Sequence, residues 1–105
     1  MAKRVINDKG FKVIKLNPSE CQKIDFGLDT ETSYQLICDN CNNLIYVDCY
    51  YVAVLNRILC EECFDEWYDS AEYYTEDARW ETNKYNHTIL RLEAHCITIE
   101  EEYYG

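Results

Sequence analysis

Two Cys-x-x-Cys pairs constrain this chain more than any other feature of its sequence. Cys38 and Cys41 form the first pair, and Cys60 and Cys63 form the second. Eighteen residues, 42–59, separate the pairs, and this spacing is typical of four-cysteine zinc sites. Zinc binds four thiolates at tetrahedral positions about 2.3 Å away, and a two-residue gap lets both sulfurs of a pair reach one ion. We therefore expect these cysteines to bind one structural zinc ion.

The residues between and after the pairs predict a β-hairpin followed by a helix. Residues 44–54 are dense in β-branched and aromatic side chains, which indicates a strand. Asn56 and Arg57 can turn the chain back into a short second strand at 58–59. Beyond the second pair, apolar residues recur at helical spacing and predict a helix with one apolar stripe. The stripe consists of Phe64, Trp67, Tyr68, Ala71 and Tyr74.

The order of cysteine turn, hairpin and helix-leading cysteine pair resembles the treble-clef zinc fingers. The resemblance covers residues 36–74 and implies that Cys38 and Cys41 form the knuckle, while Cys60 and Cys63 lead the helix. Asn42 stands where such fingers usually have glycine, a mild departure because Asn tolerates a left-handed backbone. The arrangement is also similar to small uncharacterised bacterial zinc-binding proteins, a resemblance that implies no particular activity.

Other interpretations of the same cysteines have less support. Buried cysteines can act as small apolar side chains, but two correctly spaced pairs favour a metal. A rubredoxin-like iron site pairs two knuckles with nearby Pro and Gly, which are missing here. A redox thiol needs cationic neighbours or a helix start, whereas these thiols are surrounded by Asp39, Glu61 and Glu62. Four cysteines also leave no open position for catalysis by zinc, so we expect no enzyme.

The bulk properties fit a small globular protein. The 105 residues predict a single domain, 1–105, with its zinc-finger core at 36–74. A hydrophobic content of 48% is enough for a core. We expect no secretory signal and no membrane span, because long apolar runs are missing. Seven cysteines in such a chain favour metal binding over disulfides. They therefore also favour a cytoplasmic location.

The segment before the cysteines predicts a hairpin and a helix. Residues 1–16 contain two β-rich runs around a turn-forming cluster. Asn17, Pro18 and Glu20 are typical of a helix start, so we expect a helix over 18–24.

The remaining segments complete a small α+β fold. Residues 85–96 fit both helical and strand spacing, and their composition favours a C-terminal helix. The other segments are expected to lack regular structure: a connecting loop at 25–33, a polar stretch at 75–84 and a solvated tail at 100–102.

Acidic residues concentrate in one segment. The formal net charge is −10, and residues 61–81 hold nine acids against one base, or −8. Such a run is usually a solvated helix face. With Tyr68, Tyr73, Tyr74 and Trp80 interleaved, it also fits a docking surface for a basic protein. The acids of that docking surface would be Asp65, Glu66, Asp69 and Glu72.

The N-terminal hairpin is basic instead. Residues 1–20 carry five bases against two acids, or +3. These bases could contact the acidic helix of the same chain, or they could contact phosphates, although the whole-chain charge repels nucleic acid. The bases are Lys3, Arg4, Lys9, Lys12 and Lys15.

Three cysteines are left over. A second metal site can be drawn from Cys21, Cys49, His95 and Cys96, but no spacing supports it.

Taken together, the closed cysteine site and the acidic aromatic segment favour a non-catalytic protein-interaction or adaptor module. The alternatives are a nucleic-acid-binding zinc finger and a thiol redox protein.

Overall fold

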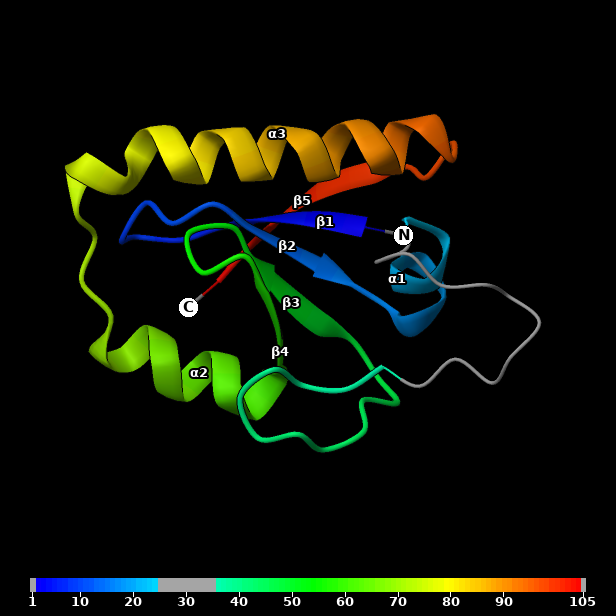
Figure 1. Cartoon of the computed structure of the whole chain (residues 1–105), viewed down its shortest axis with the longest axis horizontal. Coiled ribbons are helices and arrows are strands. Elements are labelled where there is room, and N and C mark those ends of the chain that lie inside the picture. Colours follow the sequence, from blue (N-terminus) through cyan, green and yellow to red (C-terminus); the bar gives the residue numbers. More distant parts are fainter. Residues whose placement is uncertain (1, 25–35, 105) are drawn as a thin grey trace.

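The computed structural model describes residues 2–24 and 36–104, which form one five-stranded sheet with helices on both faces (Figure 1). The loop predicted at 25–33 lies outside these residues. A short 3₁₀ helix, η1, precedes the longest helix. The elements are β1 (Ala2–Ile6), β2 (Val13–Leu16), α1 (Pro18–Ile24), β3 (Cys49–Val52), β4 (Arg57–Cys60), α2 (Glu61–Ser70), η1 (Thr75–Asp77), α3 (Ala78–Ala94) and β5 (Ile99–Tyr103).

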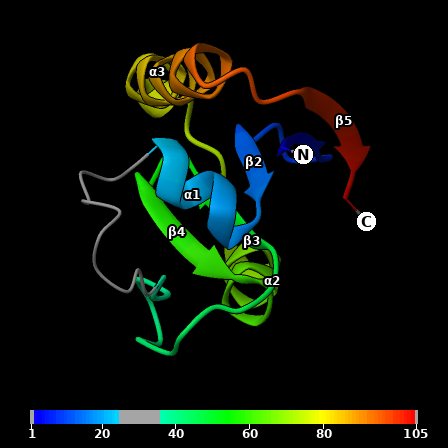
Figure 2. The ribbon, with the colours of Figure 1, turned by 90° about the vertical axis from the view of Figure 1, so that its right-hand side faces the viewer.

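The strands follow the order β4-β3-β2-β1-β5. Neighbouring strands are antiparallel except β1 and β5, which are parallel. α3 covers one face of the sheet and α2 lies on the other (Figures 1 and 2). Because successive side chains of a strand point to opposite faces, Tyr50 faces α2 while Tyr51 faces the other side. Tyr50 stacks on Phe64 of α2, with ring centroids 4.2 Å apart.

The predicted N-terminal elements are confirmed. β1 and β2 form the hairpin, and Gly10 adopts a left-handed backbone with φ 82° in its turn. α1 begins with the predicted capping box. The Asn17 Oδ1 accepts the backbone N–H of Glu20 at 2.8 Å, and the Glu20 Oε1 accepts that of Asn17 at 3.0 Å.

The predicted strand at 44–54 is too long. β3 comprises only Cys49–Val52. The chain before β3 pairs instead with the residues that precede the first cysteine pair, through an isolated bridge between Ile37 and Leu44. Ile45 donates its backbone N–H to Leu36 at 2.7 Å in the same pairing. Residues 44 and 45 therefore pair with residues 36 and 37 around the first cysteine pair, and they do not extend β3.

The prediction of an irregular stretch at 75–84 is wrong. η1 and the first half of α3 occupy it, and α3 continues to Ala94, which confirms the predicted helix in the second half. The apolar periodicity of this helix is interrupted in the sequence because a core position is occupied by an acid, Glu81, which is fully buried. Its carboxyl group accepts the backbone N–H of Lys12 at 2.9 Å and the hydroxyl of Tyr73 at 3.1 Å.

The tail at 100–102 is solvated at Glu100 and Glu101, as predicted, but it does not lack regular structure. Residues 99–103 form β5, which pairs with β1 in parallel. Glu102 accepts hydrogen bonds from Lys3 at 3.2 Å and Lys15 at 3.1 Å. These donors lower the pKa of Glu102, so one of the three glutamates of β5 is paired with the basic hairpin. Beyond β5, Tyr104 packs edge-on against Phe64 with ring centroids 5.2 Å apart.

α2 is shorter than its apolar pattern predicts. The helix ends at Ser70, so Ala71 and Tyr74 lie beyond it, and Tyr74 is exposed. Lys9 of the β1–β2 turn caps this end. Its ammonium group donates to the backbone carbonyls of Tyr68 and, at 2.9 Å, of Ala71, which satisfies groups that a helix end leaves without partners.

Replacing Glu81 with Ala should lower the free energy of unfolding by about 2 kcal/mol, because two partly buried donors lose their acceptor. Urea unfolding followed by circular dichroism would measure the change. Glu93→Ala, on the exposed side of the same helix, is the matched control and should change stability by less than about 0.5 kcal/mol. Equal effects of the two substitutions would contradict the assigned role of Glu81.

Candidate metal centre

The first cysteine pair lies in a tight turn at residues 38–41. Asn42 donates its backbone N–H to the Cys38 carbonyl at 3.0 Å, and Cys38 donates its own to Asn43 at 3.0 Å. Asn42 adopts the left-handed conformation, with φ 62°. The residue that departs from the usual glycine therefore has the backbone that the turn requires.

Asp39 fastens this turn to the hairpin. Its backbone N–H donates to the Ile58 carbonyl at 2.9 Å, and its Oδ2 accepts the Ile58 N–H at 2.8 Å. The sequence analysis treated Asp39 only as a negative neighbour of the thiols. Its position between two cysteines gave no sign of this bond, because the partner lies 19 residues away in β4.

The second pair lies where β4 passes directly into α2. Cys60 is the last residue of β4 and the N-cap residue of α2, with an extended backbone at φ −70° and ψ 165°. Its side chain makes no capping hydrogen bond. Cys63 follows in the first turn of the helix and is buried. This junction confirms the predicted order of hairpin, cysteine pair and helix.

The four sulfurs converge on one point. The Sγ atoms of Cys38, Cys41, Cys60 and Cys63 all lie within 4.8 Å of one another, and those of Cys41 and Cys60 are 3.9 Å apart. Tetrahedral zinc with bonds of about 2.3 Å places its sulfurs about 3.8 Å apart. The group is therefore close enough to hold one metal ion, and its size and donor atoms fit zinc.

Amide groups surround the sulfurs. Cys38 Sγ accepts the backbone N–H of Asn40 at 3.4 Å and that of Cys60 at 3.3 Å. Burial raises the pKa of the Cys38 thiol, but these bonds and a backbone bond from Cys41 outweigh it and lower the pKa to about 7. Hydrogen bonds of this kind orient thiolate ligands and stabilise their charge in metal sites.

Asn40 has a second role that the sequence analysis missed. Its side-chain Nδ2 donates to Cys63 Sγ at 3.3 Å, so this residue of the first turn reaches a sulfur of the second pair. A polar side chain between two ligands of a Cys-x-x-Cys turn is the only signal that could have indicated it.

The remaining cysteines do not assemble the second site. Cys21 and Cys49 are fully buried, with Sγ atoms 3.5 Å apart. His95 and Cys96 are exposed at the end of α3. Within residues 2–24 and 36–104, the only group of three or more potential metal ligands is the one formed by Cys38, Cys41, Cys60 and Cys63.

Comparisons with known proteins add no relative. No protein-family model matches the sequence, and neither curated proteins nor solved structures give a significant match. Among the described residues, no helix is long and apolar enough to cross a membrane. Inferences about function therefore depend on the geometry of this chain alone.

Replacing Cys60 with Ser should unfold or severely loosen residues 38–70, because a metal that lost one of its four sulfur ligands would no longer tie the 38–41 turn, β4 and α2 together. Thermal melts monitored by circular dichroism would measure the loss. Cys96→Ser, at an exposed position, changes the same atom outside the cluster and should leave the melting temperature nearly unchanged. Similar losses in both variants would mean that the cluster does not hold the fold together.

Proposed function

We propose that the chain is a non-catalytic protein-interaction module, built on a treble-clef-like finger with one structural zinc ion. The observation that carries this proposal is the convergence of four cysteine sulfurs from the 38–41 turn, β4 and α2 within 4.8 Å. The knuckle, hairpin and ligand-bearing helix follow one another in treble-clef order. Four sulfur ligands close the coordination sphere, which suits a structural site rather than a catalytic one.

Purified protein should contain about one zinc ion per chain, because four cysteine ligands fill one tetrahedral site. Elemental analysis of the folded protein would measure it. Cys41→Ser should lose the metal, whereas Cys96→Ser should retain it. Iron in place of zinc would favour the rubredoxin-like alternative, and folded wild-type protein without metal would refute the proposal.

The zinc-bearing helix presents an acidic surface. One side of α2 is buried through Cys63 and Phe64, and the exposed residues of the helix are five acids and Ser70. We call the surface that these acids form the acidic face. It comprises Glu61, Glu62, Asp65, Glu66 and Asp69. A rigid row of like charges on an anchored helix would attract a basic partner and accelerate its association.

The predicted docking surface needs two corrections. Glu72, one of the four predicted acids, lies beyond the end of α2, where it accepts the hydroxyl of Tyr74 at 3.1 Å. Asp65 accepts the hydroxyl of Tyr104 at 2.6 Å, so it also holds the C-terminal segment in place. Of the interleaved aromatic residues, Tyr74 and Trp80 are exposed at 53% and 50%, whereas Tyr68 and Tyr73 are partly buried.

The four lysines of the hairpin have partners within the chain, which favours a protein partner over nucleic acid. Lys3 and Lys15 pair with Glu102. Lys9 caps α2, and the ammonium group of Lys12 lies 5.4 Å from the ring centroid of Tyr85. Phosphate binding would require these cations to leave their intramolecular partners.

Reversing Glu62, Glu66 and Asp69 to Lys should leave the fold intact and weaken binding of a labelled lysine- and arginine-rich peptide by about tenfold or more, mainly through slower association. Stopped-flow and equilibrium anisotropy would measure both quantities. Raising salt should weaken the wild-type complex in the same way, because exposed charges beyond about 10 Å are screened at 0.1 M.

A triple reversal elsewhere serves as the control for net charge. Glu93→Lys, Glu100→Lys and Glu101→Lys change the total charge equally, but their exposed side chains lie on α3 and β5. This variant should retain most of the affinity. If both triple variants bound the peptide as tightly as wild type, the acidic face would be only a solvated surface.

A further inference from the structure

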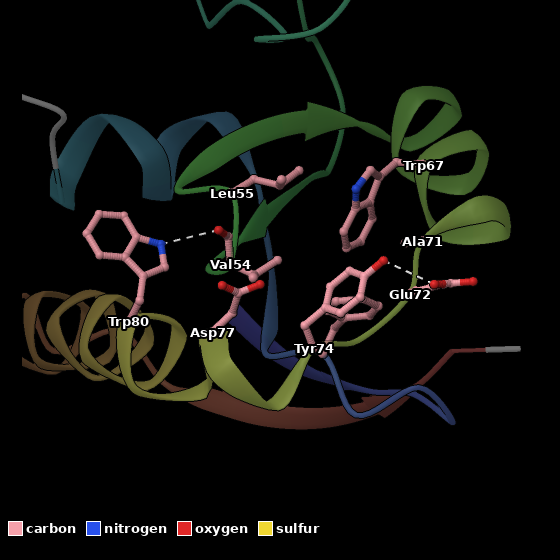
Figure 3. Close-up of a pocket in the computed structure, with 9 residues that line it drawn as sticks. Val54, Leu55, Trp67, Ala71, Glu72, Tyr74, Asp77 and Trp80 are labelled. Atoms are coloured by element: carbon pink, nitrogen blue, oxygen red, sulfur yellow. Dashed lines mark hydrogen bonds between the residues drawn. The ribbon is translucent and has the colours of Figure 1, made fainter.

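A cavity of about 550 Å³ opens beside the C-terminal end of α2. The α2–η1 connection, the first turn of α3 and the β3–β4 turn enclose it (Figure 3). Aromatic rings and carboxylates line most of it. The residues that matter to the argument are Leu55, Trp67, Glu72, Tyr74, Asp77 and Trp80.

The aromatic side chains stand at two ends of this cavity. Figure 3 shows Trp67 and Tyr74 at one end, Trp80 at the other, and the Asp77 carboxylate between them. Trp80 donates its indole N–H to the Val54 carbonyl at 3.2 Å, which fixes the ring against the β3–β4 turn. Tyr74 donates its hydroxyl to Glu72 at 3.1 Å. Two of the rings are therefore held in place before any ligand binds.

The charged side chains that line the cavity, Glu72 and Asp77, are acidic. Two cations lie at its edge: Lys9 donates to the carbonyl of Ala71, and Lys84 lies over the ring of Trp80. Asp77 is the N-cap residue of α3, yet its side chain makes no capping hydrogen bond. The hydrogen bond to Glu72 and the charges of Glu72 and Asp77 raise the pKa of Tyr74. An entering group would thus meet aromatic faces and negative charge together, the combination that attracts organic cations.

Trp80 already demonstrates this attraction within the chain. The ammonium group of Lys84, one turn further along α3, lies 4.4 Å from the centroid of the Trp80 ring. The indole is therefore placed where a cation is stabilised.

The space continues beyond the first cavity. A second hollow of about 380 Å³ shares Leu55 and Trp67 with it and is also lined by Asn40, Arg57, Leu59, Cys63 and Glu66. The two hollows together run along α2 from its C-terminal end to the metal centre. A single side chain would fill only part of this length, so the shape suits an extended segment of polypeptide.

We infer that the cavity receives an arginine side chain from an extended basic segment of the partner, with the guanidinium between the aromatic rings and opposite Asp77. This inference rests on the proposed function and assigns the residue that the basic partner contributes. Arginine suits the site better than lysine, because a planar guanidinium stacks on aromatic rings and can donate two parallel hydrogen bonds to a carboxylate.

Tryptophan fluorescence provides a direct measurement, because both tryptophans of the chain line the cavity. The probe is a capped peptide with one central arginine and lysines in the flanks. Two matched peptides replace the arginine with citrulline, which is similar in shape but neutral, or with lysine. We expect the arginine peptide to change the fluorescence and to bind about fivefold or more tightly than either. Equal binding of all three peptides would overturn the inference.

Two variants locate the binding in the cavity. Asp77→Asn keeps a good N-cap residue, and Tyr74→Ala removes one exposed ring. Each should abolish the preference for arginine over citrulline. Glu93→Gln and Tyr103→Ala remove an exposed acid and an exposed tyrosine outside the cavity and should retain the preference. If the cavity variants also retained it, arginine would bind elsewhere.

The same peptides separate this inference from the proposed function. If reversal of Glu62, Glu66 and Asp69 weakens all three peptides while Asp77→Asn and Tyr74→Ala change none of them, the acidic face binds basic partners and the cavity does not. If no variant weakens any peptide, the proposed function fails together with the inference.

Discussion

The junction between β4 and α2 is the constraint on which the rest of the molecule depends. At this junction a strand becomes a helix within one residue, Cys60, and two further elements are tied to it. The 38–41 turn is joined through Asp39 and through the hydrogen bonds to Cys38. α2 then carries Phe64 onto Tyr50 and Tyr104. A metal ion bound by the four cysteines would lock this junction, because ion binding to such sites contributes on the order of 10 kcal/mol to folding.

The charge distribution follows from the same architecture. Lysines of the basic hairpin are paired within the chain, with Glu102 of β5 and with the carbonyl groups at the end of α2. The acids of α2 have little such compensation and face solvent. A chain with a net charge of −10 therefore places uncompensated acids beside the aromatic cavity at the C-terminal end of α2. We propose that the acidic face and this cavity form one binding surface for a basic segment.

Local signals predicted much of the fold. The cysteine spacing predicted that four sulfurs distant in the sequence would cluster. The capping residues Asn17 and Glu20 predicted the start of α1, and the turn-forming cluster predicted the first hairpin. Features that depend on distant partners were missed. β5 is rich in glutamate, and it pairs with β1 while its Glu102 accepts hydrogen bonds from Lys3 and Lys15. The start of α3 was not predicted because burial of Glu81 depends on Lys12 and Tyr73, which lie outside the helix.

X-ray absorption at the zinc edge tests the central claim most directly, since it reports the ligands of the metal in the intact protein. The account predicts a first shell of four sulfur atoms at about 2.3 Å, with no nitrogen or oxygen ligand. A shell containing nitrogen or oxygen, or fewer than four sulfurs, would contradict the assignment of Cys38, Cys41, Cys60 and Cys63 as the complete and closed ligand set.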